Sequence, residues 1–156
     1  MNRSDRTVAE TLEPRLLLAT FVVTTNGDSG AGSLRQAITS ANATSGADVI
    51  QFNLPGTTAA SRQISPATPL PEIRTPLTID GTTQPGYSAG APVVRLSGNG
   101  TGLSFVAAGE VAVCGLSITN CSTAAIRVYG GQRAVIEGNW IGITPDGSVR
   151  DRENTP

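Results

Sequence analysis

Apolar positions recur along the second half of the chain, each returning at i+23. The segment VAVCGLSI (111–118) returns as AVIEGNWI (134–141), and the same offset carries Leu103 onto Ile126. Apolar positions and the central glycine keep their places while polar positions vary, as expected of stacked repeats. The units are too rich in Val, Ile, Thr and Gly for helical hairpins. The pattern predicts an all-β parallel β-helix, in which each turn bonds only to its neighbours.

The repeat also predicts where the turns lie. Three turns start around Ile79, Val113 and Ile136, so the coils occupy about residues 77–147. The first two starts lie further apart than the last two, and the Gly- and Pro-rich segment 82–92 is expected to be a loop that absorbs the excess. Alternation in 116–119 (LSIT) predicts that every second residue faces inward. Prolines confine residues 54–75 to at most one ragged extra turn.

Residues 21–54 form a different unit, in which the apolar spacing changes. Residues 21–24 have strand composition, and Ser33 is a good N-cap residue. Leu34, Ala37, Ile38 and Ala41 then follow helical spacing, which predicts a helix over 34–43, before strand composition returns at 48–52. We expect this unit to cap the first coil, whose apolar interior and unpaired backbone groups would otherwise be exposed.

Composition excludes several classes of protein. The 156 residues carry a net charge of −1 with neither sign clustered, so we expect no nucleic-acid partner. No apolar run approaches the roughly 20 residues of a membrane span. The chain has no His and only two Cys, Cys114 and Cys121, too few for a structural zinc site. Free thiols and a disulfide both remain open, and no cofactor is expected.

The N-terminus carries a short motif. The string LEPRLLLA (12–19) resembles the LEPR-XLL motif near the N-termini of large surface or extracellular proteins of planctomycete bacteria. The resemblance implies export, with residues 1–20 as a targeting segment and a secreted or cell-surface location. The alternative is that this apolar stretch simply becomes the first strand.

A second resemblance covers residues 24–38 (TTNGDSGAGSLRQAI). They are similar to the SLREA-type motif of bacterial and chlamydial surface proteins, with Gln36 where that family usually has Glu and Gly32 where it often has Cys. Segments 77–87 and 136–142 look like the repeats of those proteins. The resemblance implies a right-handed parallel β-helix, the pectate-lyase-like fold, over residues 21–147. Because this fold hosts adhesins, passenger domains and polysaccharide lyases, it does not fix the function.

One pair of acids could carry catalysis. Asp80 and Glu137 occupy equivalent positions two coils apart, hence roughly 10 Å from each other, near the upper limit for the carboxylates of an inverting glycosidase. Alternatively, both are corner residues that satisfy backbone N–H groups. Arg127 and Arg133 lie near Glu137 in sequence, but the several acids of a calcium-dependent lyase site are missing.

Three other residues could bind a ligand. Asn26 and Asp28 could hold Ca²⁺ or form Asx turns in their Gly-rich loop. Trp140 could stack on a sugar ring or pack under a neighbouring loop. Asn120 and Asn139 fall at coil corners, where Asn tolerates left-handed backbone geometry.

The C-terminal segment has no apolar helix to close the stack. After Ile143 the chain continues TPDGSVRDRENTP, with a turn signal at 145–147 and a polar tail at 148–156. We expect either truncation of a longer family member or an open end that pairs edge to edge with another copy. We predict a secreted or cell-surface protein with a structural, adhesive or glycan- or partner-binding role. The alternative is a carbohydrate-active enzyme, a polysaccharide lyase or glycoside hydrolase, or a fragment of one.

Overall fold

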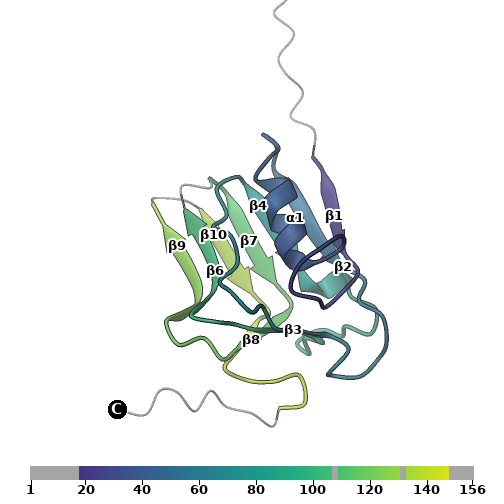
Figure 1. Ribbon diagram of the computed structural model, residues 1–156. Coiled ribbons are helices and arrows are strands. Elements are labelled where there is room, and N and C mark those ends of the chain that lie inside the picture. The colour runs from purple at the N-terminus through teal and green to yellow at the C-terminus, as the bar shows by residue number, and fades with distance from the viewer. Residues whose placement is uncertain (1–17, 107–108, 131–132, 148–156) are drawn as a thin grey trace, which may run out of the picture.

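The computed structural model describes residues 18–106, 109–130 and 133–147 (Figure 1). This part of the chain is built mainly of strands, with one α-helix and one short 3-10 helix. In chain order the elements are β1 (Thr20–Val23), α1 (Leu34–Ala41), β2 (Asp48–Phe52), β3 (Gln63–Ile64), β4 (Leu77–Asp80), η1 (Gly81–Thr83), β5 (Val94–Ser97), β6 (Thr101–Val106), β7 (Val111–Cys114), β8 (Leu116–Thr119), β9 (Ala124–Tyr129), β10 (Ala134–Glu137) and β11 (Trp140–Ile141).

The described strands form three parallel sheets. Sheet A has the order β1-β2-β4-β7-β10, sheet B the order β3-β5-β8-β11, and sheet C consists of β6 and β9. From β4 onward the chain visits A, B and C in turn, and we call each such circuit a coil. Each strand therefore lies against its equivalent in the preceding coil, as Figure 1 shows for β4, β7 and β10. The strand-rich, parallel character expected from the repeat is confirmed.

The strand register follows the sequence repeat. Ala134 pairs with Val111 and Ile126 with Leu103, which confirms the expected offset from i to i+23. Between β4 and β7 the offset is larger, because Leu77 pairs with Val111. The extra residues form η1 and the loop that follows it, and pairing resumes with Val94 against Leu116.

Inward side chains stack in ladders that run from coil to coil. In sheet A, Ile50, Ile79 and Val113 are fully buried one above the other. Equivalent ladders in the other sheets are made of Ile64, Leu96 and Ile118, and of Leu103 with Ile126 and Phe105 with Val128. These mainly aliphatic ladders constitute the core, which explains how a chain with few aromatic residues fills its interior.

The inward residues of β8, Leu116 and Ile118, belong to the core, but the outward residues between and after them are not exposed. All four residues of β8 are buried, and Ser117 and Thr119 are both fully shielded from solvent. The physical reason is that other segments cover the outer face of sheet B at this point. Ser117 Oγ donates a 2.5 Å hydrogen bond to the carbonyl of Ile143, and Thr119 Oγ1 accepts one of 2.8 Å from Arg95 Nε.

Helix α1 has the predicted N-cap and the predicted buried face. Ser33 Oγ accepts a hydrogen bond from Gln36 N, and Leu34, Ala37, Ile38 and Ala41 are buried. The helix ends at Ala41 rather than at residue 43, because Thr44 N turns back to bond Ala41 O. It packs on β1 and β2, which lie at the N-terminal end of sheet A before the first coil (Figure 1).

Strand pairing begins well before residue 77, where the first coil was expected to start. β2 pairs with β4, and β1 pairs in turn with β2. In the Pro-rich segment only two residues, Gln63 and Ile64, form a strand, and Ile73 adds an isolated bridge to Phe105. This is the ragged extra turn that the prolines predict.

Candidate functional site

Asp80 stands at the end of β4 and is used to shape the next corner. Its Oδ1 accepts hydrogen bonds from Thr82 N at 2.9 Å and from Thr82 Oγ1 at 2.5 Å, and thereby caps η1. The same oxygen accepts a contact from the Cys114 thiol, 3.3 Å away. One carboxylate oxygen of Asp80 is thus committed to local structure.

Glu137 lies on the same ladder as Asp80. Asp80 pairs with Cys114 and Cys114 with Glu137, so the two acids are two strand spacings apart, roughly 10 Å. The thiol between them stays protonated. Burial raises the pKa of Cys114 to about 12, and the hydrogen bond and negative charge of Asp80 and the charge of Glu137 act in the same direction. Asp80 and Glu137 thus share one ladder, with a neutral thiol between them.

Neither Cys114 nor Cys121 forms a disulfide bond, so both are reduced. Cys114 contacts Asp80 as described, and the Cys121 thiol lies 3.4 Å from the carbonyl of Thr119. Of the two states that the sequence leaves open, the structure has the reduced one.

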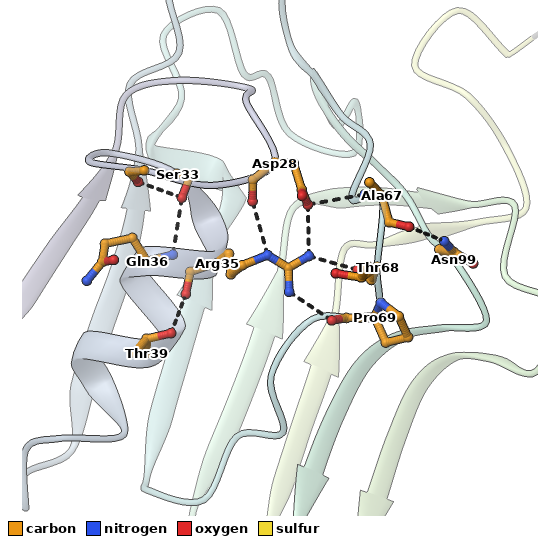
Figure 2. A network of polar contacts seen from close by, with 10 residues as sticks. Asp28, Ser33, Arg35, Gln36, Thr39, Ala67, Thr68, Pro69 and Asn99 are labelled. Atoms are coloured by element: carbon orange, nitrogen blue, oxygen red, sulfur yellow. Dashed lines mark hydrogen bonds and ion pairs between the residues drawn. The ribbon is translucent and has the colours of Figure 1, made fainter.

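Asp28 belongs to a polar network centred on Arg35 (Figure 2). Asp28 Oδ1 accepts hydrogen bonds from Arg35 Nη2 at 2.8 Å and from Ala67 N at 3.1 Å. The Arg35 guanidinium holds the pKa of Asp28 below its usual value, because it hydrogen-bonds the carboxylate. Asn26 lies apart from this ion pair and donates to the carbonyl of Ala60. A cation at Asp28 would have to compete with the positive charge already there.

Arg35 joins three segments, a role that its sequence context does not predict. Its Nε donates to the carbonyl of Asp28, while Nη2 and Nη1 donate to the carbonyls of Thr68 and Pro69 at 2.8 and 2.9 Å. Figure 2 shows the guanidinium between the helix, the Gly-rich loop and the Pro-rich segment. The only signal in the sequence is one Arg in the first turn of an amphipathic helix, which does not reveal its distant partners.

Outward positions of sheet B form a further ladder. Gln63, Arg95, Ser117 and Trp140 occupy equivalent positions in successive coils. Arg95 Nη1 donates to Gln63 Oε1 at 3.1 Å, Ser117 is covered by the chain at Ile143, and Trp140 is half-buried. We call these four residues the sheet B ladder.

The corner asparagines behave differently from each other. Asn120 has φ +56°, so it adopts the expected left-handed conformation. Asn139 does not; Gly138 takes that conformation in its place, with φ +61°. The Asn139 side chain instead bridges the preceding coil, where Oδ1 accepts from Leu116 N and Nδ2 donates to Val113 O.

Two surface hollows lie away from the acid pair. An open hollow of about 430 Å³ is lined by Asn42, Pro71, Glu72 and Arg74. A groove of about 250 Å³ runs over the outer face of sheet A, lined in part by Val49, Thr78, Ala112 and Val135. The groove is smaller than typical small-molecule pockets, and neither of these hollows is lined by Asp80 or Glu137.

Within the described ranges, no three His, Cys, Asp or Glu side chains are grouped to hold a metal ion. No helix in the part of the chain that the structure describes is long and apolar enough to cross a bilayer. Most of the LEPRLLLA motif and the tail 148–156 lie outside the described residues. Comparisons with protein-family models, with curated proteins and with solved structures gave no match.

Proposed function

We propose that the chain is a right-handed parallel β-helix from an exported or cell-surface protein, with a structural, adhesive or glycan-binding role. The proposal rests on stacking in register, which sets equivalent outward side chains side by side at roughly 4.8 Å per coil. The resemblances at residues 12–19 and 24–38 support the handedness and the export.

The sheet B ladder is the surface that best suits a polysaccharide. Within a few coils it offers an amide at Gln63, a guanidinium at Arg95 and an indole at Trp140. Amide and guanidinium groups hydrogen-bond hydroxyl or carboxylate oxygens, and an indole face packs on apolar surface. A glycan chain can contact these groups on either side of Ser117, which the chain at Ile143 covers.

A glycan array probed with the wild-type protein, Trp140→Ala and Tyr129→Ala tests this role. We expect Trp140→Ala to lose binding and Tyr129→Ala to retain it, because Tyr129 is exposed on sheet C, away from the ladder. No binding by the wild type, or equal loss in both variants, would refute a glycan site at this ladder. Cell fractionation tests export, and a purely cytosolic protein would contradict it.

The alternative, a carbohydrate-active enzyme, rests on the placement of Asp80 and Glu137 on one ladder. An assay of polygalacturonate and alginate cleavage by the wild type, Asp80→Asn and Glu137→Gln tests it. Cleavage that disappears in both variants would replace the binding role with a catalytic one. If the wild type does not cleave these substrates, Asp80 and Glu137 are not the catalytic acids of an enzyme that acts on polygalacturonate or alginate.

A further inference from the structure

In the part of the chain that the structure describes, the last coil leaves the stack uncovered at one end. Ile136 and Ile141 continue the inward ladders below Val113 and Ile118, which are fully buried. Yet Ile136 is 48% exposed and Ile141 51% exposed. At the opposite end the corresponding surface is covered by α1. Within the described residues, β10 is thus an exposed edge strand beside exposed core residues, the type of surface that pairs with another strand.

The backbone of β10 limits how another strand can pair with it. Val111 N donates to Arg133 O, so the backbone of Arg133 points toward β7. Because backbone direction alternates along a strand, Val135 and Glu137 also point toward β7, whereas Ala134 and Ile136 direct their N–H and C=O groups to the free edge. Ala134 and Ile136 are also the residues whose side chains follow the inward ladder.

We propose that two copies of this chain associate through β10, antiparallel, about a two-fold axis at Val135. Ala134 of each copy then lies opposite Ile136 of the other and exchanges both hydrogen bonds with it. The inward side chains of the two copies fall on the same side of the joined sheet. The exposed Ile136 residues gain cover, and the two cores become continuous.

Charge favours this register over its neighbours. A shift of the register by one residue would place Ala134 and Ile136, whose backbone groups face the partner, opposite residues whose backbone groups face away from it. It would also place inward side chains of one copy opposite outward side chains of the other. With the axis at Val135, Arg133 of one copy lies opposite Glu137 of the other, on both sides of the axis, although Arg133 Nη1 also lies 3.4 Å from Glu110 Oε1 of its own chain. With the axis at Ile136, Glu137 would instead face Val135. Only the first register pairs Arg133, which precedes β10, with Glu137, the last residue of β10.

Disulfide trapping tests the axis directly. Val135 meets its own equivalent as a non-hydrogen-bonded pair, with Cα atoms about 4.5 Å apart, within reach of a disulfide after small adjustment. In a Cys114→Ser, Cys121→Ser background, Val135→Cys should form a covalent dimer under a glutathione redox buffer. Glu137→Cys is the matched control. Position 137 is also exposed on β10, but in the proposed dimer it lies too far from position 137 of the other copy to cross-link.

Light scattering during size-exclusion chromatography of the full chain gives the second readout. We expect the wild-type protein to have twice the mass of one chain. The Ala134→Pro variant should be monomeric, because proline removes only an N–H that faces the free edge of β10. Arg133→Glu should weaken the dimer about tenfold, and Arg133→Glu with Glu137→Arg should restore it. A monomeric wild type, as expected if residues 148–156 or another partner covers the edge, would overturn the proposal. A dimer that Ala134→Pro leaves intact, or equal cross-linking at positions 135 and 137, would also overturn it.

Discussion

At the scale of single residues, the corner between sheets A and B depends on two glycines in contact. A Cβ on Gly81 would lie 2.4 Å from the carbonyl oxygen of Gly115, and a Cβ on Gly115 would lie 2.8 Å from Thr82 N. Gly115 also has φ +67°, which is unfavourable for residues with a side chain. The tight corner brings η1 against the next coil, so neither glycine has room for a substituent.

Gly115→Ala should therefore lower the free energy of unfolding by about 2–4 kcal/mol. Gly90→Ala is the control, since Gly90 has φ +77° but nothing within 4 Å of the added Cβ, and should cost only about 1 kcal/mol. Urea titration of both variants measures the difference. Equal losses would mean that backbone conformation alone, and not close packing, fixes the corner.

The Cys114 thiol should react slowly in the folded protein. Its pKa is raised from 9.0 to about 12, so the thiolate fraction at pH 8 is roughly a thousandfold lower than in the unfolded chain. In a Cys121→Ser background we expect alkylation by iodoacetamide to be more than tenfold slower in buffer than in urea. Because the thiol ionises more readily in the unfolded chain, the free energy of unfolding should also fall as pH rises above about 9. Rates within twofold of each other would contradict burial of the thiol.

Some of these residue properties could be predicted from the sequence and others could not. Gly115 and Gly138 recur at the repeat offset, so their shared role is visible in the sequence. The contact of Gly115 with Gly81 depends on the longer offset between β4 and β7, and the partners of Arg35 depend on the path of the Pro-rich segment. The placement of the acid pair on one ladder follows from the repeat, but the bonds that occupy Asp80 follow from η1, which the residue pattern predicts only as loop.

At the scale of elements, side-chain amides join segments of neighbouring coils. Asn42 accepts from Arg74 N and donates to Glu72 O, and Asn139 bridges Val113 and Leu116 in the same way. Gln84 is the most buried of them, at 2% exposure, and bonds both the N–H and the carbonyl of Leu54. Each amide supplies the donor and the acceptor that irregular backbone would otherwise lack.

Gln84→Glu should destabilise the protein by about 2–3 kcal/mol at pH 7, because a buried carboxylate would face the carbonyl of Leu54. A protonated Glu can donate to that carbonyl, so its folded-state pKa should be raised. The loss should then be small below pH 4 and grow as pH rises. Gln36→Glu, on the exposed face of α1, should change stability little. Equal effects of both substitutions at pH 4 and pH 7 would contradict this role of Gln84.

Elements with regular spacing were predictable, whereas those defined by tertiary contacts were not. The helix followed from Ser33 and four apolar residues at helical spacing, and the coils followed from the constant offset of the repeat. β3 could not be placed, because two residues between prolines have no periodicity of their own. The burial of Ser117 could not be foreseen either, since it depends on the chain folding back at Ile143.

At the scale of the whole molecule, the loss of stability caused by an Ile→Ala substitution should depend on the coil in which the residue lies. Ile79→Ala removes a fully buried side chain between Ile50 and Val113 and should cost about 3–4 kcal/mol. Ile136→Ala, at the open end of that ladder, should cost less than about 1.5 kcal/mol in the monomer. Urea unfolding at low protein concentration compares the two. Similar costs would mean that the last coil is not an open end.

At the corner after β4, the length of the loop does not affect the register of the strands. The extra residues between β4 and β7 leave Asp80 paired with Cys114 and Val94 paired with Leu116. Closing a longer loop adds only about 0.6 kcal/mol for each doubling of its length. A foreign peptide inserted near Ser88 should therefore be displayed beside the coils without disturbing them, which would make this corner a grafting point for an engineered scaffold.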